Sequence, residues 1–198
     1  MKNLEIYIHI PFCVRKCEYC DFLSFPADDD AKLRYVKGLM AEMIFYGPLM
    51  KNYQVSSVYI GGGTPSSIDE QWIAALMEGV FDCFNVLPDA EISIECNPGT
   101  LSREKLLAYR DAGINRLSIG LQSANNDELK LLGRIHTFEQ FVTNYEVARN
   151  VGFKNINVDL MYGLPGQSAS QYMATVNKII RLHPDPVSYT HLRAHETD

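Results

Sequence analysis

Residues 4–20 read Leu4-Glu5-Ile6-Tyr7-Ile8-His9-Ile10-Pro11-Phe12-Cys13-Val14-Arg15-Lys16-Cys17-Glu18-Tyr19-Cys20. Apolar and polar side chains alternate over the first seven positions, and this period of two predicts a β-strand. Three cysteines follow directly, in the spacing CxxxCxxC. The chain therefore places a group of possible metal ligands in the loop after its first predicted strand.

Beyond this loop the apolar pattern switches between the helical period of 3.6 and the strand period of two. Predicted helices lie at about 33–44, 72–83, 102–113, 138–152 and 172–180, and predicted strands at 58–60, 92–94, 117–121 and 156–160. Strands that alternate with helices predict parallel βαβ units and an α/β fold. Five such units are too few for a complete eightfold barrel, which typically needs about 250 residues. The alternatives are an open doubly wound sheet and a partial barrel.

Polar side chains lie near the carboxyl ends of several predicted strands, namely Tyr7, Glu95, Gln122 and Asp159. In parallel barrels and open α/β sheets this end carries the ligand site. Parallel strands that are buried on both faces usually read as continuous apolar runs, whereas these strands have one polar face. This favours a water-accessible cavity inside a partial barrel. Any one of the four could instead satisfy loop backbone.

The composition is that of an ordinary globular domain, with 46% hydrophobic and 21% charged residues among 198. It excludes a disordered chain, and no apolar run approaches the roughly 18 residues of a transmembrane helix. Eighteen basic against 24 acidic residues give a net charge of −6, which argues against a nucleic-acid partner. The N-terminus carries no secretory pattern, so we expect a cytoplasmic protein with no transmembrane segment.

The last twelve residues, VSYTHLRAHETD at 187–198, look like a translated sequencing adapter. The alternative is a genuine polar tail. We expect a core domain at 1–186 and a non-native tail at 187–198, so the fold prediction rests on the core. On this interpretation the barrel is truncated after about five βα units, and the fifth strand has an exposed edge.

The five cysteines are an odd number in a chain without an export pattern, so we expect metal ligands or catalytic groups in place of disulfides. Thiolates from Cys13, Cys17 and Cys20 can hold an iron–sulfur cluster with one iron left open. Structural zinc needs four ligands, and Cys83 or Cys96 would have to complete the set. Cys83 lies on the apolar stripe of a predicted helix, where it packs as a small hydrophobe, whereas Cys96 follows a strand end. Spacing favours the cluster but leaves zinc open.

With these motifs in view, residues 4–186 resemble the radical S-adenosylmethionine (SAM) enzymes. Within that superfamily, six motifs in order resemble the oxygen-independent coproporphyrinogen III oxidase family. They are Tyr7-Ile8-His9-Ile10-Pro11-Phe12-Cys13 leading into Cys17-Glu18-Tyr19-Cys20, Gly61-Gly62-Gly63-Thr64-Pro65-Ser66, Glu95-Cys96-Asn97-Pro98-Gly99-Thr100, Gly120-Leu121-Gln122-Ser123, Gly133-Arg134-Ile135-His136 and Asp159-Leu160-Met161-Tyr162-Gly163-Leu164-Pro165-Gly166. A lone glycine triplet would be weak evidence, but six motifs at strand ends and loops are specific.

The resemblance implies a partial (β/α)6 barrel, a [4Fe-4S] cluster and SAM. It implies that Cys13, Cys17 and Cys20 hold the cluster, whose open iron binds the amino and carboxylate groups of SAM. The implied SAM contacts are Tyr19 at the adenine, Gly62, Gly63 and Thr64 at the methionine amino end, and Glu95, Gln122, Arg134 and Asp159 elsewhere, with Tyr7 beside the cluster. Without the resemblance, the glycines could form only a tight strand exit and Arg134 could be a solvated helix-end charge.

The family contains two functions that the sequence distinguishes at two places. The oxidase has a further cysteine two positions after the third ligand, where this chain has Phe22, and an extension before the first strand, where this chain has twelve residues before Cys13. Both departures favour the haem (heme) chaperone branch, which binds haem and transfers it to acceptor proteins. The alternative is the oxidase itself, a radical SAM oxidative decarboxylation that gives protoporphyrinogen IX. A radical SAM enzyme that acts on tRNA fits the acidic charge poorly.

The resemblance also implies partners: haem or a porphyrin, a haem-acceptor protein, and an electron donor such as flavodoxin or ferredoxin. SAM cleavage is plausible, but no catalytic residue is assigned. In the chaperone branch the haem-binding motif lies in a C-terminal region that we expect this chain to lack. No haem ligand is therefore assigned here, and haem is expected as a cofactor of the full-length protein.

Overall fold

The computed structural model describes residues 1–182 and 187–191. Its centre is one sheet of parallel strands in the spatial order β1-β2-β3-β4-β5-β6. The strands are β1 (Lys2–Ile10), β2 (Tyr53–Gly62), β3 (Val86–Cys96), β4 (Arg116–Gln122), β5 (Asn155–Tyr162) and β6 (Val187–His191). A spatial order equal to the chain order means that every crossover steps the same way, as in a barrel, whereas a doubly wound sheet reverses direction. The partial-barrel prediction is confirmed.

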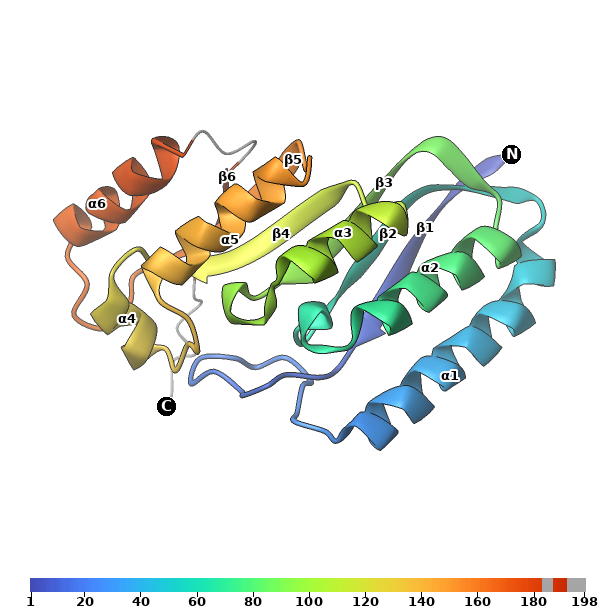
Figure 1. Ribbon diagram of the computed structural model, residues 1–198, viewed down its shortest axis with the longest axis horizontal. Coiled ribbons are helices and arrows are strands. Elements are labelled where there is room, and N and C mark those ends of the chain that lie inside the picture. The colour runs from blue at the N-terminus through green and yellow to red at the C-terminus, as the bar shows by residue number, and fades with distance from the viewer. Residues whose placement is uncertain (183–186, 192–198) are drawn as a thin grey trace.

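The helices form one layer over the face of the sheet that is turned toward the viewer in Figure 1. They are α1 (Asp29–Tyr46), α2 (Glu70–Cys83), α3 (Arg103–Asp111), α4 (Asn126–Leu131), α5 (Phe138–Asn150) and α6 (Ala169–Ile180). Short 3-10 helices lie at Gly47–Met50, Pro65–Ser67 and Pro98–Thr100. None of the described helices combines the length and apolarity that crossing a membrane requires.

Helix ends follow the capping residues in the sequence. Ser102 caps α3 by accepting a hydrogen bond from Lys105 N, and Gly113 beyond its end has a φ of +87°. Thr137 and Gln140 form a reciprocal capping box at the start of α5. A side-chain cap satisfies a backbone N–H that has no partner inside the helix, which is why these boundaries were predictable.

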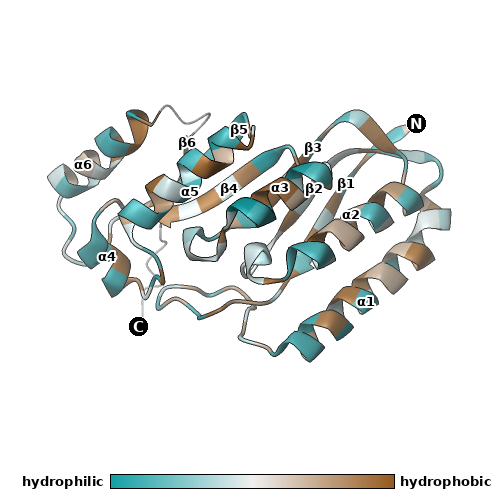
Figure 2. Ribbon diagram, viewed as in Figure 1, coloured by the Kyte–Doolittle hydropathy of each residue, from teal (hydrophilic) through white to brown (hydrophobic). Residues whose placement is uncertain are grey.

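The core lies between the sheet and the helices, and alternation along each strand creates it. In β4, Leu117, Ile119 and Leu121 are fully buried, while Ser118 and Gly120 occupy the alternate positions. Helices contribute facing residues such as Leu76, Leu106, Phe141 and Ile179. Figure 2 shows the apolar segments along the sheet and on the helices that cover it. The polar alternate positions are thereby turned to the other face of the sheet.

The structure corrects the prediction for the edge of β5. Val187 to His191, in the segment set aside as a tail, form β6 in parallel register with β5, from Val158↔Val187 to Tyr162↔His191. The physical reason is that an edge strand offers unpaired N–H and C=O groups, and β-branched and aromatic residues favour extended backbone. Residues 192–198 of the predicted tail lie outside the described residues.

Candidate cofactor site

A cavity of about 900 Å³ opens on the inner face of the sheet and at the carboxyl ends of its strands. All predicted metal and cofactor residues except Tyr7 line it: Cys13, Cys17, Tyr19, Cys20, Gly62, Gly63, Thr64, Glu95, Gln122, Arg134 and Asp159. They come from the cysteine loop, from β2 to β5 and from the loop after α4. The fold thus brings together groups that lie as far as 146 positions apart (159 − 13) in the chain.

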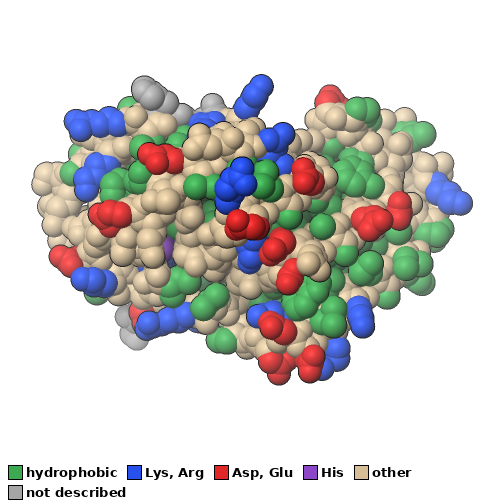
Figure 3. All heavy atoms as spheres, in the orientation of Figure 1, with side chains coloured by type: hydrophobic (Ala, Val, Ile, Leu, Met, Phe, Trp, Pro, Cys, Tyr) green, Lys and Arg blue, Asp and Glu red, His purple; other side chains and the backbone are tan. Residues whose placement is uncertain are grey.

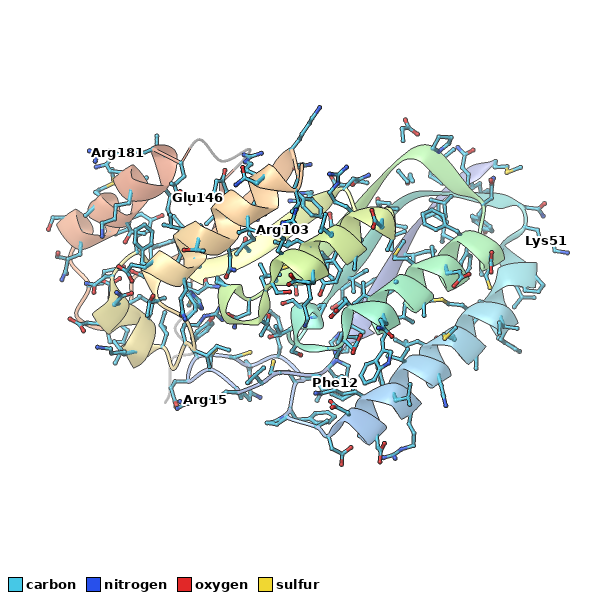
Figure 4. The ribbon with its side chains drawn as sticks, in the orientation of Figure 1. Phe12, Arg15, Lys51, Arg103, Glu146 and Arg181 are labelled. Atoms are coloured by element: carbon cyan, nitrogen blue, oxygen red, sulfur yellow. The ribbon has the colours of Figure 1, made fainter. Side chains whose placement is uncertain are left out.

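The cysteine loop leaves β1 and is held at both ends by backbone hydrogen bonds. Cys13 N donates to Phe25 O over 3.2 Å, and Phe25 N donates to Pro11 O over 3.0 Å, so the loop returns to its own start. At the far side Glu18 N donates to Leu132 O over 3.2 Å, just after α4. Figure 4 shows this loop, with Phe12 near β1 and Arg15 toward the region of α4. The three cysteines are therefore displayed along one rim of the cavity.

The three thiols have different neighbours. Cys13 is buried, and its Sγ lies 3.4 Å from Thr64 Oγ1. Cys17 and Cys20 are half-buried in a turn closed by Cys20 N and Cys17 O. No three Cys, His, Asp or Glu side chains of the described residues are grouped as ligands of a single metal ion. A [4Fe-4S] cluster spreads its ligands over separate irons, so it needs wider spacing than tetrahedral zinc with Zn–S bonds of about 2.3 Å.

Two glycines, the last residue of β2 and the one after it, allow the chain to pass close to β1 and the cysteine loop. Gly62 has a φ of +118°, and a Cβ there would lie 2.6 Å from the His9 ring. A Cβ on Gly63 would lie 2.7 Å from Phe12 O and 3.0 Å from Cys13 Sγ. Only glycine fits both positions, since a Cβ on Gly62 would displace His9 of β1 and a Cβ on Gly63 would displace the cysteine loop. The backbone of β2 therefore forms one wall of the cavity directly beside a thiol.

Glu95 is held at the end of β3 by two donors. Tyr59 Oη donates to Oε1 over 2.8 Å, and Gly62 N donates to Oε2 over 3.0 Å. Burial raises the pKa of Glu95, and these two hydrogen bonds oppose the rise. Burial also raises the pKa of Tyr59, which keeps its hydroxyl protonated as a donor. The carboxylate is fixed in orientation at the cavity wall.

Tyr7 is the one predicted site residue that the structure does not bring to the cavity lining. Its side chain is 58% exposed, its ring stacks on that of Tyr59 with centroids 6.1 Å apart, and its hydroxyl lies 3.1 Å from His9 Nδ1. Tyr7 is the register partner of Tyr59 across β1 and β2, so it lies on the same face of the sheet and contacts the cavity lining through the Tyr59 ring. Its assignment beside a cluster remains a prediction.

Asp159 belongs to a polar group on the inner face of β4 and β5. Its Oδ2 accepts from Ser118 Oγ over 2.9 Å and its Oδ1 from Asn157 Nδ2 over 2.8 Å. Arg116, at the start of β4, donates to Ser93 Oγ over 3.2 Å. These side chains form the floor of the cavity below the strand ends.

Arg134 connects the loop after α4 with the cysteine loop. Its Nη1 lies 3.6 Å from Cys17 Sγ and 3.4 Å from Tyr19 Oη, and its Nη2 donates to Gly120 O. Burial raises the pKa of Tyr19 to about 12, although the guanidinium opposes this rise. Arg134 Nε is buried and has no hydrogen-bond partner among the described residues. Gln122, at the end of β4, has a φ of +73°, a strained conformation of the kind found at ligand sites.

Several lining residues were not predicted from sequence, namely Tyr59, Arg116, Ser118, Asn157 and Met161. Most are alternate residues of strands whose other positions are apolar, and that alternation was the signal for them. Cys96, the thiol that the sequence left open as a fourth zinc ligand, is buried and lines the cavity. Burial raises its pKa. Cys83 is partly buried against the core, as predicted for a small hydrophobe.

The residues fit a thiolate-bound cluster with a small charged ligand beside it. Three free thiols share a cavity with two glycines that leave room for close approach, and with a guanidinium whose Nε has no partner among the described residues. The carboxylates of Glu95 and Asp159 face the same space and suit a cationic ligand.

Residues 7–179 match the Radical SAM superfamily. The chain is 38% identical to the heme chaperone HemW of Escherichia coli, over 96% of this chain and 50% of that protein. It is 35% identical to the oxygen-independent coproporphyrinogen III oxidase of the same organism, over 96% of this chain and 43% of that protein. The solved structure of E. coli coproporphyrinogen III oxidase (HemN) has a TM-score of 0.89 at 33% identity and covers 96% of this chain and 44% of that chain. The chain spans about half the length of the curated relatives it matches.

Proposed function

The chain belongs to the radical SAM superfamily, and on this premise we propose that it is the radical SAM core of a haem chaperone, which binds haem and transfers it to acceptor proteins. The superfamily implies a [4Fe-4S] cluster and SAM as cofactors. The similarity to curated heme chaperones at 34–38% identity supports the choice of haem as the ligand.

We assign the cluster to Cys13, Cys17 and Cys20, with the remaining iron available to SAM. When bound, the cluster supplies one-electron chemistry to SAM. The chain's own residues position the cofactor. The backbone at Gly63 admits it close to Cys13, since a Cβ there would lie 3.0 Å from Cys13 Sγ, and Gly62 lets β2 pass close to His9.

Charge complementarity supports the SAM assignment. SAM carries a sulfonium and an ammonium group, and Glu95 and Asp159 place two carboxyl groups in the same cavity. Arg134 and Tyr19 lie beside Cys17, where a carboxylate or an adenine ring could be held. Thr64 and Gln122 complete the proposed contacts, and Tyr7 acts through Tyr59 and His9.

The observation that favours the chaperone over the oxidase is the side chain at position 22, which is Phe22. It lines the cavity and is 68% exposed, two positions after Cys20, where the oxidase family has a further cysteine. An exposed aromatic side chain at a cavity mouth suits a flat, apolar ligand such as a porphyrin and cannot supply a thiol. The oxidase remains the second candidate because HemN superposes with a TM-score of 0.89.

The remaining parts of the proposal concern partners and location. We propose a haem-acceptor protein, an electron donor such as flavodoxin or ferredoxin, and a cytoplasmic location. No nucleic-acid partner is included, since the net charge is −6. In Figure 3 acidic and basic side chains are interspersed on the helical face.

The test uses the natural full-length protein, reconstituted anaerobically with iron and sulfide. We expect stoichiometric haem binding by absorbance titration, and no vinyl product when SAM, a reductant and coproporphyrinogen III are supplied. The control is the same protein with Cys13, Cys17 and Cys20 replaced by alanine, which separates haem binding from cluster chemistry. Catalytic formation of the vinyl product would contradict the chaperone and favour the oxidase.

A further inference from the structure

Asn97 is a cavity residue whose backbone is held firmly. It lies between β3 and the 3-10 helix Pro98–Thr100, is 9% exposed and lines the cavity. Its N donates to Ser66 Oγ over 3.0 Å, and its O accepts from Thr100 N over 2.9 Å and from Thr100 Oγ1 over 2.8 Å. The position of this residue is therefore set by three hydrogen bonds before its side chain is considered.

The side-chain amide of Asn97 is oriented by two further groups. Gly99 N donates to Oδ1 over 3.2 Å, and His136 Nδ1 lies 3.1 Å from the same oxygen. A backbone N–H can only donate, so the atom that faces Gly99 is the oxygen. His136 Nδ1 must then carry the hydrogen. Burial lowers the pKa of His136 to about 3, so the imidazole is neutral with this tautomer.

These contacts leave one polar group unused. Both hydrogen bonds go to Oδ1, and the Nδ2 amino group of Asn97 has no hydrogen-bond partner in the part of the chain that the structure describes. The loop that carries His136 also carries Arg134, two positions earlier, and both Arg134 and Asn97 line the cavity. The two loops are packed together, since a Cβ on Gly99 would lie 3.0 Å from Ile135 Cγ1.

We propose that Asn97 Nδ2 is a ligand-binding donor that hydrogen-bonds an acceptor oxygen of SAM, a carboxylate or hydroxyl oxygen, and that His136 is a positioning residue which acts through Asn97. This rests on the cofactor part of the proposed function. A capping role of Asn97 toward Gly99 uses only Oδ1, so the two roles reside on different atoms. Fixing the amide in advance lowers the entropy lost when the ligand binds.

The first test removes the donor and keeps the acceptor. Asn97→Asp retains an oxygen for Gly99 N and His136, whereas Asn97→Ala removes both. The probe is SAM itself, titrated by equilibrium dialysis against the reconstituted chain, with iron content and melting temperature measured alongside. We expect the Kd for SAM to rise at least about tenfold in both variants, with unchanged iron. Asn150→Asp, at the exposed end of α5, adds the same charge away from the cavity and should bind like the parent.

The second test asks whether His136 acts through Asn97. His136→Ala should weaken SAM binding in the parent but have no further effect in Asn97→Ala, because the group it orients is absent. His136→Asn, whose amide can donate at the position of Nδ1, should restore most of the affinity.

Three outcomes would overturn the inference in distinguishable ways. A Kd within twofold of the parent in both Asn97 variants removes the donor role, while the cofactor assignment stands. If His136→Ala raises the Kd for SAM equally in the parent and in Asn97→Ala, His136 does not act through Asn97. A reconstituted parent that binds no SAM refutes the cofactor part of the proposed function together with this inference.

Discussion

Arg134 Nη1 lies 3.6 Å from Cys17 Sγ, although 117 positions separate the two residues in the chain. The same nitrogen lies 3.4 Å from Tyr19 Oη, so one guanidinium contacts two residues of the cysteine loop. The other terminal nitrogen, Nη2, donates to Gly120 O and connects the guanidinium to β4. The loop after α4 therefore contributes directly to the geometry of the cysteine rim.

Replacing Arg134 tests whether this residue contributes to SAM binding or only to assembly of the cysteine loop. Arg134→Ala keeps all three cysteines, so we expect normal iron content after reconstitution. Binding of SAM should weaken at least tenfold, since a hydrogen bond to a charged group is worth about 1.5–3 kcal/mol. Iron analysis and SAM titration check this. Arg103→Ala, exposed at the start of α3 (Figure 4), is the control and should change neither quantity.

Gly63→Ala tests the close approach of β2 to the cysteine loop. The added Cβ would lie 2.7 Å from Phe12 O and 3.0 Å from Cys13 Sγ, so the loop must move. We expect reduced cluster content and weaker SAM binding, measured by iron analysis and titration. Gly38→Ala in α1 is the matched control, because its Cβ meets nothing within 4 Å and alanine favours helix by up to about 1 kcal/mol. Equal cluster content in the two variants would show that the approach is not critical.

Tyr59→Phe removes one of the two donors that hold Glu95. Glu95 Oε1 then has no donor in a buried setting, so we expect a loss of about 2 kcal/mol in the free energy of unfolding at pH 7. The loss should shrink at acidic pH, where a protonated Glu95 needs the hydroxyl less. Urea denaturation at both pH values measures it. Tyr53→Phe, at the start of β2, should have little effect, and a similar loss there would point to a general aromatic contribution.

The pH dependence of stability should contain a contribution from His136. Its folded-state pKa of about 3 lies below the ordinary value of 6.5, because burial and the nearby Arg134 disfavour the charged ring. The unfolded chain therefore takes up the proton first as pH falls, and stability decreases below pH 6.5 at up to about 1.4 kcal/mol per pH unit. The variant His136→Asn lacks this contribution. The parent's free energy of unfolding should therefore fall toward that of the variant as pH falls. The difference between them should shrink by at most about 2 kcal/mol between pH 7 and pH 5, measured by urea unfolding. An unchanged difference would mean that the ring titrates normally in the folded protein.

Much of the fold could be predicted because the period of the apolar residues and the helix-capping residues indicate the same elements. The stripe from Phe138 onward and the capping box at Thr137 both specify α5, and the alternation in 117–121 specifies β4. Helix α4 (Asn126–Leu131) was not predicted, since six residues are too short to show a helical stripe. Its position depends on tertiary contacts, such as the hydrogen bond that Gln167 Nε2 donates to Glu128 Oε2 over 2.9 Å.

The candidate site could be predicted as a set of residues but not as a geometry. Strand-end residues such as Glu95 and Asp159 meet because parallel strands place their carboxyl ends together. Tyr59 holds Glu95 in place, and His136 holds Asn97 in place, and no spacing in the sequence indicates either pair. Tyr7 shows the converse, because it pairs with Tyr59 and stacks on its ring, yet of the two only Tyr59 lines the cavity.

The claim that supports the rest is that Cys13, Cys17 and Cys20 jointly hold one iron–sulfur cluster. Anaerobic reconstitution of the chain, followed by iron, sulfide and zinc analysis, tests it directly. We predict about four irons and four sulfides per chain in the parent and in Cys83→Ala, and loss of both in Cys13→Ala, Cys17→Ala and Cys20→Ala. Stoichiometric zinc without sulfide in the parent, or an intact cluster spectrum in Cys17→Ala, would contradict the account.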